Sequence, residues 1–373
     1  MYKNVVIGSG LSAITTAAKL LDKNQLVYMY DIGDSYEEDI NEFKNSLIKN
    51  KKNYFKILTQ IIKNIRNKKN LNNKFYFGSE FSYKSKNEIF KSTAQGGLSN
   101  IWGANMLSYH PSDIAEWPIS QQELQKNYDF LIKTLNIQST KNNNLNKEFR
   151  FNSSKDSALR KYVRDKQTNF ILKELNFNKK SLNKNNIFFG ETNLSLVPNV
   201  DCLKCGFCFY GCPNNLIFNS KYLLKKLKKN KKFNYIPYSK VINFKEIKNK
   251  VILNLINVKN KKMFKDECDY LFLTNGTFNI IDLLKNSKVI NQRINIYQSQ
   301  QFIFFGKIRN FKEKISNQIN TMAKINLDFK KKDISNNFIH IQIYPLSDIL
   351  LFNSFYKINF LKKIFFKIIF NYF

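Results

Sequence analysis

The stretch of sequence that decides the fold is Val5-Val6-Ile7-Gly8-Ser9-Gly10-Leu11-Ser12-Ala13. Its three apolar residues predict a buried parallel strand, Gly8 permits a tight turn, and Gly10 leaves room for a pyrophosphate beside the backbone. Ala13 replaces a third glycine and lets the following helix pack closely, while the helix N-terminus at Leu11 and Ser12 offers amide donors to phosphates. A second apolar strand ends at Asp31, 21 residues after Gly10, where a carboxylate can hydrogen-bond ribose. The spacing predicts a dinucleotide site.

The length and composition of the chain limit its class. A chain of 373 residues can bury a substantial core and is expected to form two lobes. Its formal net charge of +33 arises from lysines that are spread along the whole chain together with asparagines. The densest basic run, residues 225–232, contains no aromatic residue that could stack on bases. We therefore expect no nucleic-acid partner.

No targeting or membrane-spanning segment is expected. Residues 1–4 lead directly into a core strand, and no window holds the roughly 18 uninterrupted apolar residues of a membrane span. Four of the five cysteines lie within residues 202–212, unlike the scattered cysteines of a secreted disulfide scaffold. These features predict a cytoplasmic protein. The apolar stripe of residues 361–372 predicts either a helix on a membrane surface, which would make the protein membrane-associated, or a helix docked on the protein body.

A second informative stretch runs from residue 93 to residue 106. Adjacent Gly96 and Gly97 let a backbone wrap closely around a flat ligand. Ser99 and Asn100 offer hydrogen-bond donors, and Trp102 offers a large apolar face. Taken alone, the stretch is equally typical of an ordinary glycine turn.

The pattern Gly96-Gly97-x-Ser99-x-x-Trp102-Gly103, with Trp117-Pro118-Ile119 downstream, resembles the glucose–methanol–choline (GMC) family of FAD-dependent oxidoreductases. The resemblance is strongest to its pyranose-oxidase-like branch and to relatives in sugar and polysaccharide pathways. It implies that residues 96–102 run along the flavin, that the backbone near Val241 meets the adenine, and that the turn at Asn275 and Gly276 packs against FAD. Ile101 stands where pyranose oxidases have a flavin-linking histidine, so the resemblance implies non-covalent FAD.

A cysteine-rich run has the C-x2-C-x2-C-x3-C-P spacing with which bacterial ferredoxins hold [4Fe–4S] clusters. A single cluster requires the fourth cysteine to fold back, or Cys268 to arrive from elsewhere. Zinc is less suited, because its knuckles are usually separated by a longer loop. Three interpretations stay open: a [4Fe–4S] cluster, a structural or thiol/disulfide loop, and a zinc site. In the first interpretation the metal ligands are Cys202, Cys205, Cys208 and Cys212.

The remaining segments complete the predicted architecture. Residues 34–92 carry one helical pattern, and residues 241–244 and 251–256 read as strands. Residues 268–277 read as an apolar strand that ends in a glycine turn. Strands at 294–297, 302–305 and 338–344 are expected in a substrate lobe. The predicted fold is α/β, with a discontinuous three-layer Rossmann-like FAD-binding domain (1–130 and 191–290), an insert or flap (131–190), and a partial α+β substrate lobe (291–373) that is incomplete at its C-terminus.

The catalytic residues are left unassigned. GMC members carry a catalytic histidine in a C-terminal segment, whereas this sequence has only His110 and His340. His340 is the one candidate base, with a structural or substrate-wall role as the alternative. We expect either a truncated or split chain, whose missing segment a second polypeptide supplies, or a degenerate one.

The function implied is FAD-dependent oxidation of a CH–OH group on a sugar or other alcohol, with hydride passing to the flavin and then to an external electron acceptor. One alternative is a catalytically incomplete flavin-binding remnant or a split-enzyme subunit. Another alternative is an iron–sulfur flavoprotein electron carrier.

Overall fold

The computed structural model describes residues 2–33, 91–140, 143–151, 154–155, 160–206, 208, 211–296, 302–304, 306–311 and 320–345. The helical pattern predicted within 34–92 and the predicted tail helix lie outside these residues. The chain forms two compact units that alternate along the sequence. Unit 1 comprises residues 1–102, 197–200 and 210–294, and unit 2 comprises 103–196, 201–209 and 295–373. Within the described ranges, every helix is too short or too polar to cross a bilayer.

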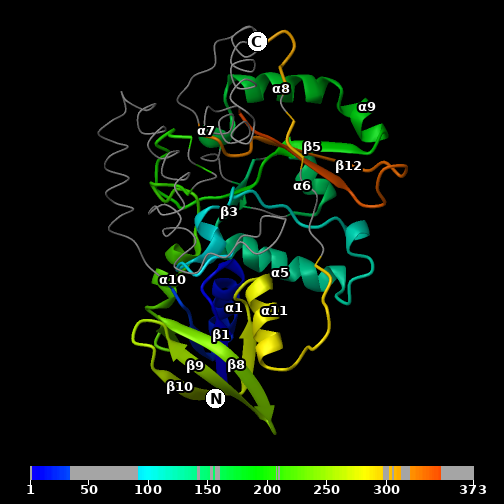
Figure 1. The fold of residues 1–373 in the computed structure, drawn as a ribbon. Helices are drawn as coiled ribbons and strands as arrows, with labels where there is room; N and C mark the ends of the chain where they lie inside the picture. Colours follow the sequence, from blue (N-terminus) through cyan, green and yellow to red (C-terminus); the bar gives the residue numbers. More distant parts are fainter. Residues whose placement is uncertain are drawn as a thin grey trace, which may run out of the picture. The chain divides into compact units, whose positions relative to one another are not determined.

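Unit 1 is built on a four-stranded parallel sheet with the strand order β11-β1-β2-β7 (Figure 1). The strands are β1 (Lys3–Ile7), β2 (Leu26–Tyr30), β7 (Phe233–Ile236) and β11 (Tyr270–Leu273). All three pairings are parallel, with Ile7 opposite both Tyr30 and Leu273. The predicted α/β class with a parallel sheet is therefore confirmed.

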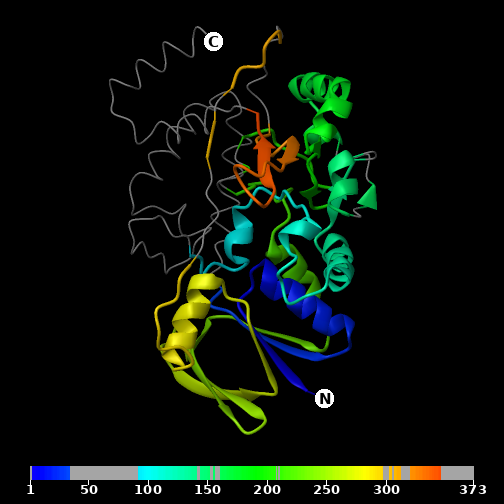
Figure 2. The same ribbon diagram turned by 90° about the vertical axis from the view of Figure 1, so that its right-hand side faces the viewer.

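Each face of this sheet is covered by a different layer. Helix α1 (Leu11–Asp22) packs on β1 and β2 and buries Ala13, Ile14 and Ala17, while α10 (Ser220–Leu227) contacts α1. An antiparallel sheet of β8 (Ser239–Ile247), β9 (Lys250–Asn257) and β10 (Met263–Cys268) covers the other face. Helix α11 (Thr277–Asn286) packs against β8 (Figures 1 and 2). Successive strand residues point to opposite faces, so Val5 and Ile7 enter the core shared with the antiparallel sheet.

A polar link ties the two sheets of unit 1 together. The Asp266 carboxylate on β10 accepts hydrogen bonds from Lys3 Nζ on β1 and from the Tyr30 hydroxyl on β2, each at 2.5 Å. Burial raises the pKa of the Asp266 carboxyl, but the hydrogen bonds from Lys3 and Tyr30 outweigh burial and hold it below the ordinary value. The carboxylate is thus stabilised in its charged form between the layers.

Unit 2 contains a three-stranded antiparallel sheet with the order β13-β12-β5. Its strands are β5 (Ile187–Glu191), β12 (Ile325–Phe329) and β13 (Ile339–Ile343), and a smaller sheet joins β3 (Ile137–Ser139), β4 (Ser154–Lys155) and β6 (Leu194–Ser195). The described helices of this unit are α5 (Gln121–Thr134), α6 (Asn144–Glu148), α7 (Arg160–Val163), α8 (Lys166–Phe177), α9 (Lys179–Lys184) and the 3-10 helix η3 (Pro111–Asp113). Leu172 of α8 packs with Phe189 and Ile325, which places the helix on the sheet.

The sequence predicted some strands and misplaced others. Strands β8, β9 and β13 confirm the predictions at 241–244, 251–256 and 338–344. Strand β11 confirms the strand predicted to start at Cys268 only from Tyr270 onward, because Cys268 is the last residue of β10. The strands predicted at 294–297 and 302–305 are wrong, because the described residues 294–296 and 302–304 are irregular. Phe302 and Phe304 are 73% and 88% exposed, so this apolar run lacks the burial that stabilises a strand.

Candidate functional site

Three turns of unit 1 meet at the N-terminus of α1, and we call residues 8–10, 96–100 and 274–276 the three-turn site. The Gly96 amide donates to Ser9 Oγ at 2.8 Å. A Cβ on Gly97 would lie 3.4 Å from Gly10 Cα, and a Cβ on Gly8 would lie 3.2 Å from Asn275 Cα. The structure therefore brings together three segments that are far apart in sequence and were all predicted to contact the cofactor.

The glycines of the site have different physical reasons to be glycine. Gly8 and Gly97 have positive φ angles of +94° and +57° and lie against neighbouring backbone. Gly10 has an ordinary extended conformation (φ −67°, ψ −178°), and a Cβ there would meet no described atom within 4 Å. Neither backbone strain nor packing against the described residues requires glycine at position 10, which leaves room for a ligand atom beside its Cα at the helix N-terminus.

That space lies over the positive end of α1. The first turn of α1 has no side-chain cap and no acidic residue. The first amides of a helix have no partner within the helix, and the macrodipole adds partial positive charge there. The amides of Leu11, Ser12 and Ala13 are accordingly available to an anion such as a pyrophosphate.

The second turn, which continues into the 3-10 helix η2 (Gly97–Asn100), uses most of its side-chain donors internally. Ser99 Oγ donates to the Gly96 carbonyl at 2.6 Å and accepts from the Ser220 amide at 2.9 Å. Asn100 Nδ2 donates to the Gly97 carbonyl at 2.9 Å, among others. Trp102 Nε1 donates to the Phe218 carbonyl at 2.6 Å. Ser99, Asn100 and Trp102 therefore shape the turn, instead of offering all their donors to a ligand.

Buried polar atoms at the site are left without partners. Asn100 Oδ1 and Asn275 Oδ1 make no hydrogen bond within the described part of the chain, and the adjacent Ser220 Oγ makes none either. A buried polar atom without a partner costs about 1–3 kcal/mol. Oxygen acceptors beside an uncapped helix N-terminus fit a ligand that carries both phosphate and N–H or O–H donors, as a dinucleotide does.

Asp31 lies directly after β2, as predicted, but its carboxylate is already engaged. The buried Oδ2 atom accepts from the Tyr235 hydroxyl at 2.9 Å, and Gln95 Nε2 donates to the same hydroxyl at 3.0 Å. Burial, followed by the negative charge of Asp31, raises the pKa of Tyr235. Gly33 has φ +59°, and a Cβ there would lie 2.5 Å from the Tyr235 hydroxyl oxygen. Sequence reasoning missed Gln95 and Tyr235, because only the folded chain brings them to Asp31. It also missed Gly33, two residues after Asp31, although its position beside that carboxylate was visible in the sequence.

Val241 is buried in the core, where its β-strand partner is Leu255. Two residues earlier, the Ser239 amide donates to the Asp31 carbonyl at 2.9 Å. This places the start of β8 beside Asp31. The contact between the Val241 backbone and adenine stays a prediction.

The cysteine-rich run is divided between the units, with Cys212 in unit 1 and its three partners in unit 2. The five cysteines, all of which the structure describes, form no disulfide bond. The Thr321 amide donates to Cys208 Sγ at 3.3 Å, and the Lys204 amide donates to Cys202 Sγ at 3.3 Å. Among the residues that the structure describes, no three His, Cys, Asp or Glu side chains are placed to hold a metal ion. The predicted [4Fe–4S] site thus gains no support from this arrangement.

Both histidines lie in unit 2. His340 Nδ1 is 2.8 Å from Asp328 Oδ1, and Gln342 Nε2 is 2.9 Å from His340 Nε2, so both ring nitrogens are engaged. Burial raises the pKa of Asp328, and the bond to His340 opposes that rise. His110 is the N-cap of η3, and its Nδ1 accepts from the Ser112 amide at 3.1 Å. Burial lowers the pKa of His110.

When the chain is compared with known proteins, only solved structures match it. No family model matches the chain, and no curated protein matches it. Pyridoxine 4-oxidase from Mesorbium loti is 14% identical, with a TM-score of 0.40, over 74% of this chain and 50% of that one. An FAD-dependent oxidoreductase from Chaetomium thermophilum is 11% identical (TM-score 0.41; 77% of this chain, 47% of that one).

Formate oxidase from Aspergillus oryzae RIB40, in a variant studied for FAD modification, is 14% identical to this chain. Its TM-score is 0.41, over 77% of this chain and 47% of that one. The chain therefore spans about half the length of these solved structures.

Proposed function

We propose that the three-turn site binds FAD non-covalently and that the protein is an oxidoreductase acting on a CH–OH group of a sugar or another alcohol. The observation that carries the proposal is the open space at Gly10, above the uncapped N-terminus of α1. The bound flavin would supply a hydride acceptor. The chain's own residues would bind and orient it.

Each part of the site has a defined role in this proposal. The amides of Leu11, Ser12 and Ala13 bind the pyrophosphate. Asp31 accepts from a ribose hydroxyl, because an ionised carboxylate has acceptor capacity beyond its bond from Tyr235. The start of β8, beside Asp31, lies next to the adenine.

The second turn favours FAD over other dinucleotides. Gly96 and Gly97 belong to the pattern that resembles the GMC flavoproteins, and Gly97 lies against Gly10. If the phosphates of a dinucleotide lie over Gly10, the part of the ligand beyond the phosphates would therefore lie along the turn at residues 96–100. The unpartnered Asn100 Oδ1 is an acceptor for N–H or O–H groups there.

The test compares two glycine-to-glutamate variants. Gly10→Glu would place a carboxylate in the phosphate position, and we expect flavin content after desalting to fall at least about tenfold. The control is Gly306→Glu, since a Cβ at the exposed Gly306 also meets no described atom within 4 Å and that residue lies in unit 2. Its flavin content should equal that of the wild type. A Gly10→Glu protein that folds and keeps its FAD would refute the site.

A second candidate function is flavin binding without alcohol oxidation by this chain. The observation that favours it is the engagement of both His340 ring nitrogens by Asp328 and Gln342. Anaerobic mixing of the FAD-loaded protein with a panel of sugars and alcohols separates the two candidates. Loss of the flavin absorption band at about 450 nm supports the oxidoreductase. A band that the substrates leave unchanged, but that dithionite removes by reducing the flavin, supports the second candidate.

A further inference from the structure

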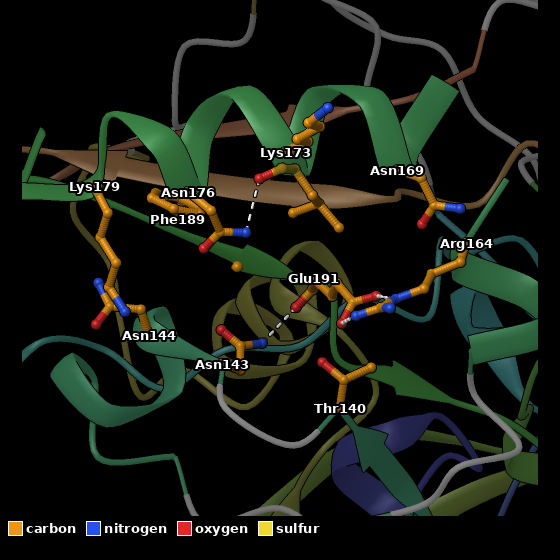
Figure 3. Close-up of a pocket in the computed structure, with 12 residues that line it drawn as sticks. Thr140, Asn143, Asn144, Arg164, Asn169, Lys173, Asn176, Lys179, Phe189 and Glu191 are labelled. Atoms are coloured by element: carbon orange, nitrogen blue, oxygen red, sulfur yellow. Dashed lines mark hydrogen bonds and ion pairs between the residues drawn. The ribbon is translucent and has the colours of Figure 1, made fainter. Parts of the chain in front are cut away.

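A pocket of about 370 Å³ lies within unit 2, between α8, the end of β5 and the start of α6 (Figure 3). Ligand pockets commonly have volumes from about 300 Å³ upward, so this space suits a small molecule of monosaccharide size. None of the predicted cofactor, metal or catalytic residues lines it.

One side of the pocket carries an organised ion pair. Arg164 binds Glu191 through two bonds, Nε to Oε1 at 2.5 Å and Nη2 to Oε2 at 3.1 Å. Glu191 is buried, whereas Arg164 is partly exposed, so the pair presents remaining guanidinium N–H groups and carboxylate lone pairs to the pocket. Hydrogen bonding to Glu191 raises the pKa of Arg164, and the guanidinium therefore stays charged.

The charge of the pocket is not balanced. Arg164 neutralises Glu191, and Lys179 also lines the pocket without an ion-pair partner among the described residues. Figure 3 shows the Lys179 side chain reaching down beside Asn144, whereas the Lys173 ammonium group points away. The excess positive charge favours one anionic group on the ligand.

A buried hydroxyl at the bottom of the pocket has no partner. Thr140 is 4% exposed, lines the pocket, and its Oγ1 atom makes no hydrogen bond in the described part of the chain. In Figure 3 its side chain points toward the Arg164–Glu191 pair. Buried hydroxyl groups are nearly always hydrogen-bonded in native proteins, so this atom indicates a polar ligand group beside it.

The pocket wall is built by specific contacts between α6 and β5. Asn143 Nδ2 donates to the Glu191 carbonyl at 2.6 Å, and Asn143 Oδ1 caps α6 by accepting from the Leu145 amide at 3.1 Å. This geometry requires glycine at position 190, because a Cβ there would lie 1.7 Å from Asn143 Oδ1. Asn169 adds a side-chain amide, which can donate to and accept from hydroxyl groups, and Phe189 adds apolar surface.

We propose that this pocket binds a small sugar that carries one anionic group, a phosphate or a carboxylate. The anionic group lies toward Lys179, and the hydroxyl groups bond to Thr140, Asn169 and the Arg164–Glu191 pair. The proposal goes beyond the proposed function and does not rest on it, because every lining residue belongs to unit 2 and binding requires no flavin.

The test is isothermal titration calorimetry on the full chain at low ionic strength with glucose 6-phosphate, glucuronate, glucose and inorganic phosphate. We expect one site per chain for an anionic sugar, with binding tighter than for glucose or phosphate. The comparison of glucose 6-phosphate with glucuronate identifies the anionic group. Absence of saturable binding by both, or phosphate binding as tightly as the better sugar, overturns the proposal.

Two variants and a matched control locate the binding. Lys179→Gln should weaken binding on the order of tenfold, whereas Lys180→Gln, which changes the next, exposed lysine outside the pocket, should leave it unchanged. Thr140→Val should weaken binding about fivefold without lowering the thermal unfolding midpoint, because it removes an unpartnered hydroxyl. Equal effects of Lys179→Gln and Lys180→Gln, or unchanged affinity in both pocket variants, would contradict the assignment.

Discussion

At the scale of single residues, the glycines of unit 1 differ in what the fold requires of them. Gly8, Gly33 and Gly97 have positive φ angles and close neighbours, so they are explained by the protein itself. Gly10 has neither, and its missing side chain leaves space over the end of α1. Because Gly10 also precedes the uncapped N-terminus of α1, its missing side chain supports a ligand at that position.

Gly33→Ala tests whether a glycine with a positive φ angle and close neighbours is required by the fold. The alanine would keep φ near +59° at a cost of about 1–2 kcal/mol and would crowd the Asp31–Tyr235 hydrogen bond. We expect the free energy of unfolding in urea to fall by at least that amount. The control is Gly306→Ala, where the added Cβ meets nothing within 4 Å. Equal stability of the two variants would show that the turn at residue 33 tolerates a side chain.

Cys268 gives a second prediction at this scale. It is fully buried in the core of unit 1, and burial raises the pKa of its thiol to about 11. Because the thiolate is the reactive form, Cys268 should resist iodoacetamide in the native protein at pH 8 and react once the protein is unfolded. Peptide mapping by mass spectrometry measures the labelling, with the partly exposed Cys212 as reference. Labelling of native Cys268 as fast as Cys212 would contradict its burial.

At the scale of elements, the best-predicted part of the fold is the one whose sequence signals lie close together in the chain. The strand, turn, helix and strand of residues 3–31 were predicted because their signals are local. Strand β12 was missed, although Ile325, Leu327 and Phe329 alternate with polar residues and its partner β13 begins ten residues after β12 ends. Its other partner, β5, is distant in sequence. The strands expected at 294–297 and 302–305 were wrong. The run at 302–305 has no alternation that specifies a partner, and the alternating residues Ile294 and Ile296 are exposed, so they lack the burial of a strand. The hydrogen bond from Tyr235 to Asp31 was not predicted, because the two residues are 204 positions apart in the sequence.

The link between the two sheets of unit 1 predicts a pH-dependent stability. The folded-state pKa of Asp266 is below its ordinary value, so its contribution is present above about pH 4 and is lost as the pH falls through the folded pKa. Asp266→Asn should lower the free energy of unfolding by roughly 1–3 kcal/mol at pH 7, and its difference from the wild type should shrink below about pH 4.

The matched control for this variant is Asp22→Asn, which changes an exposed carboxylate at the end of α1. Urea unfolding of both variants between pH 3 and pH 7 gives the comparison. A stability difference for Asp266→Asn that stays constant across this range would mean that the charge of Asp266 does not link the sheets.

At the scale of the whole molecule, the two units hold different chemistry. Unit 1 contains the three-turn site, whose residues were largely named by the sequence, because glycines and helix starts have local signatures. Unit 2 contains the pocket, which sequence reasoning missed entirely. Thr140, Arg164 and Glu191 come from a segment without a recognisable motif, and only folding brings an arginine to a buried glutamate. The net charge of +33 identified neither site.

The most direct test of the central claim is the binding of FAD to the wild-type chain. Protein purified and freed of loose flavin is examined by visible absorption, and any flavin-free fraction is titrated with FAD. The three-turn site predicts saturation at one FAD per chain, retained through desalting. A colourless protein that takes up no FAD would contradict the account.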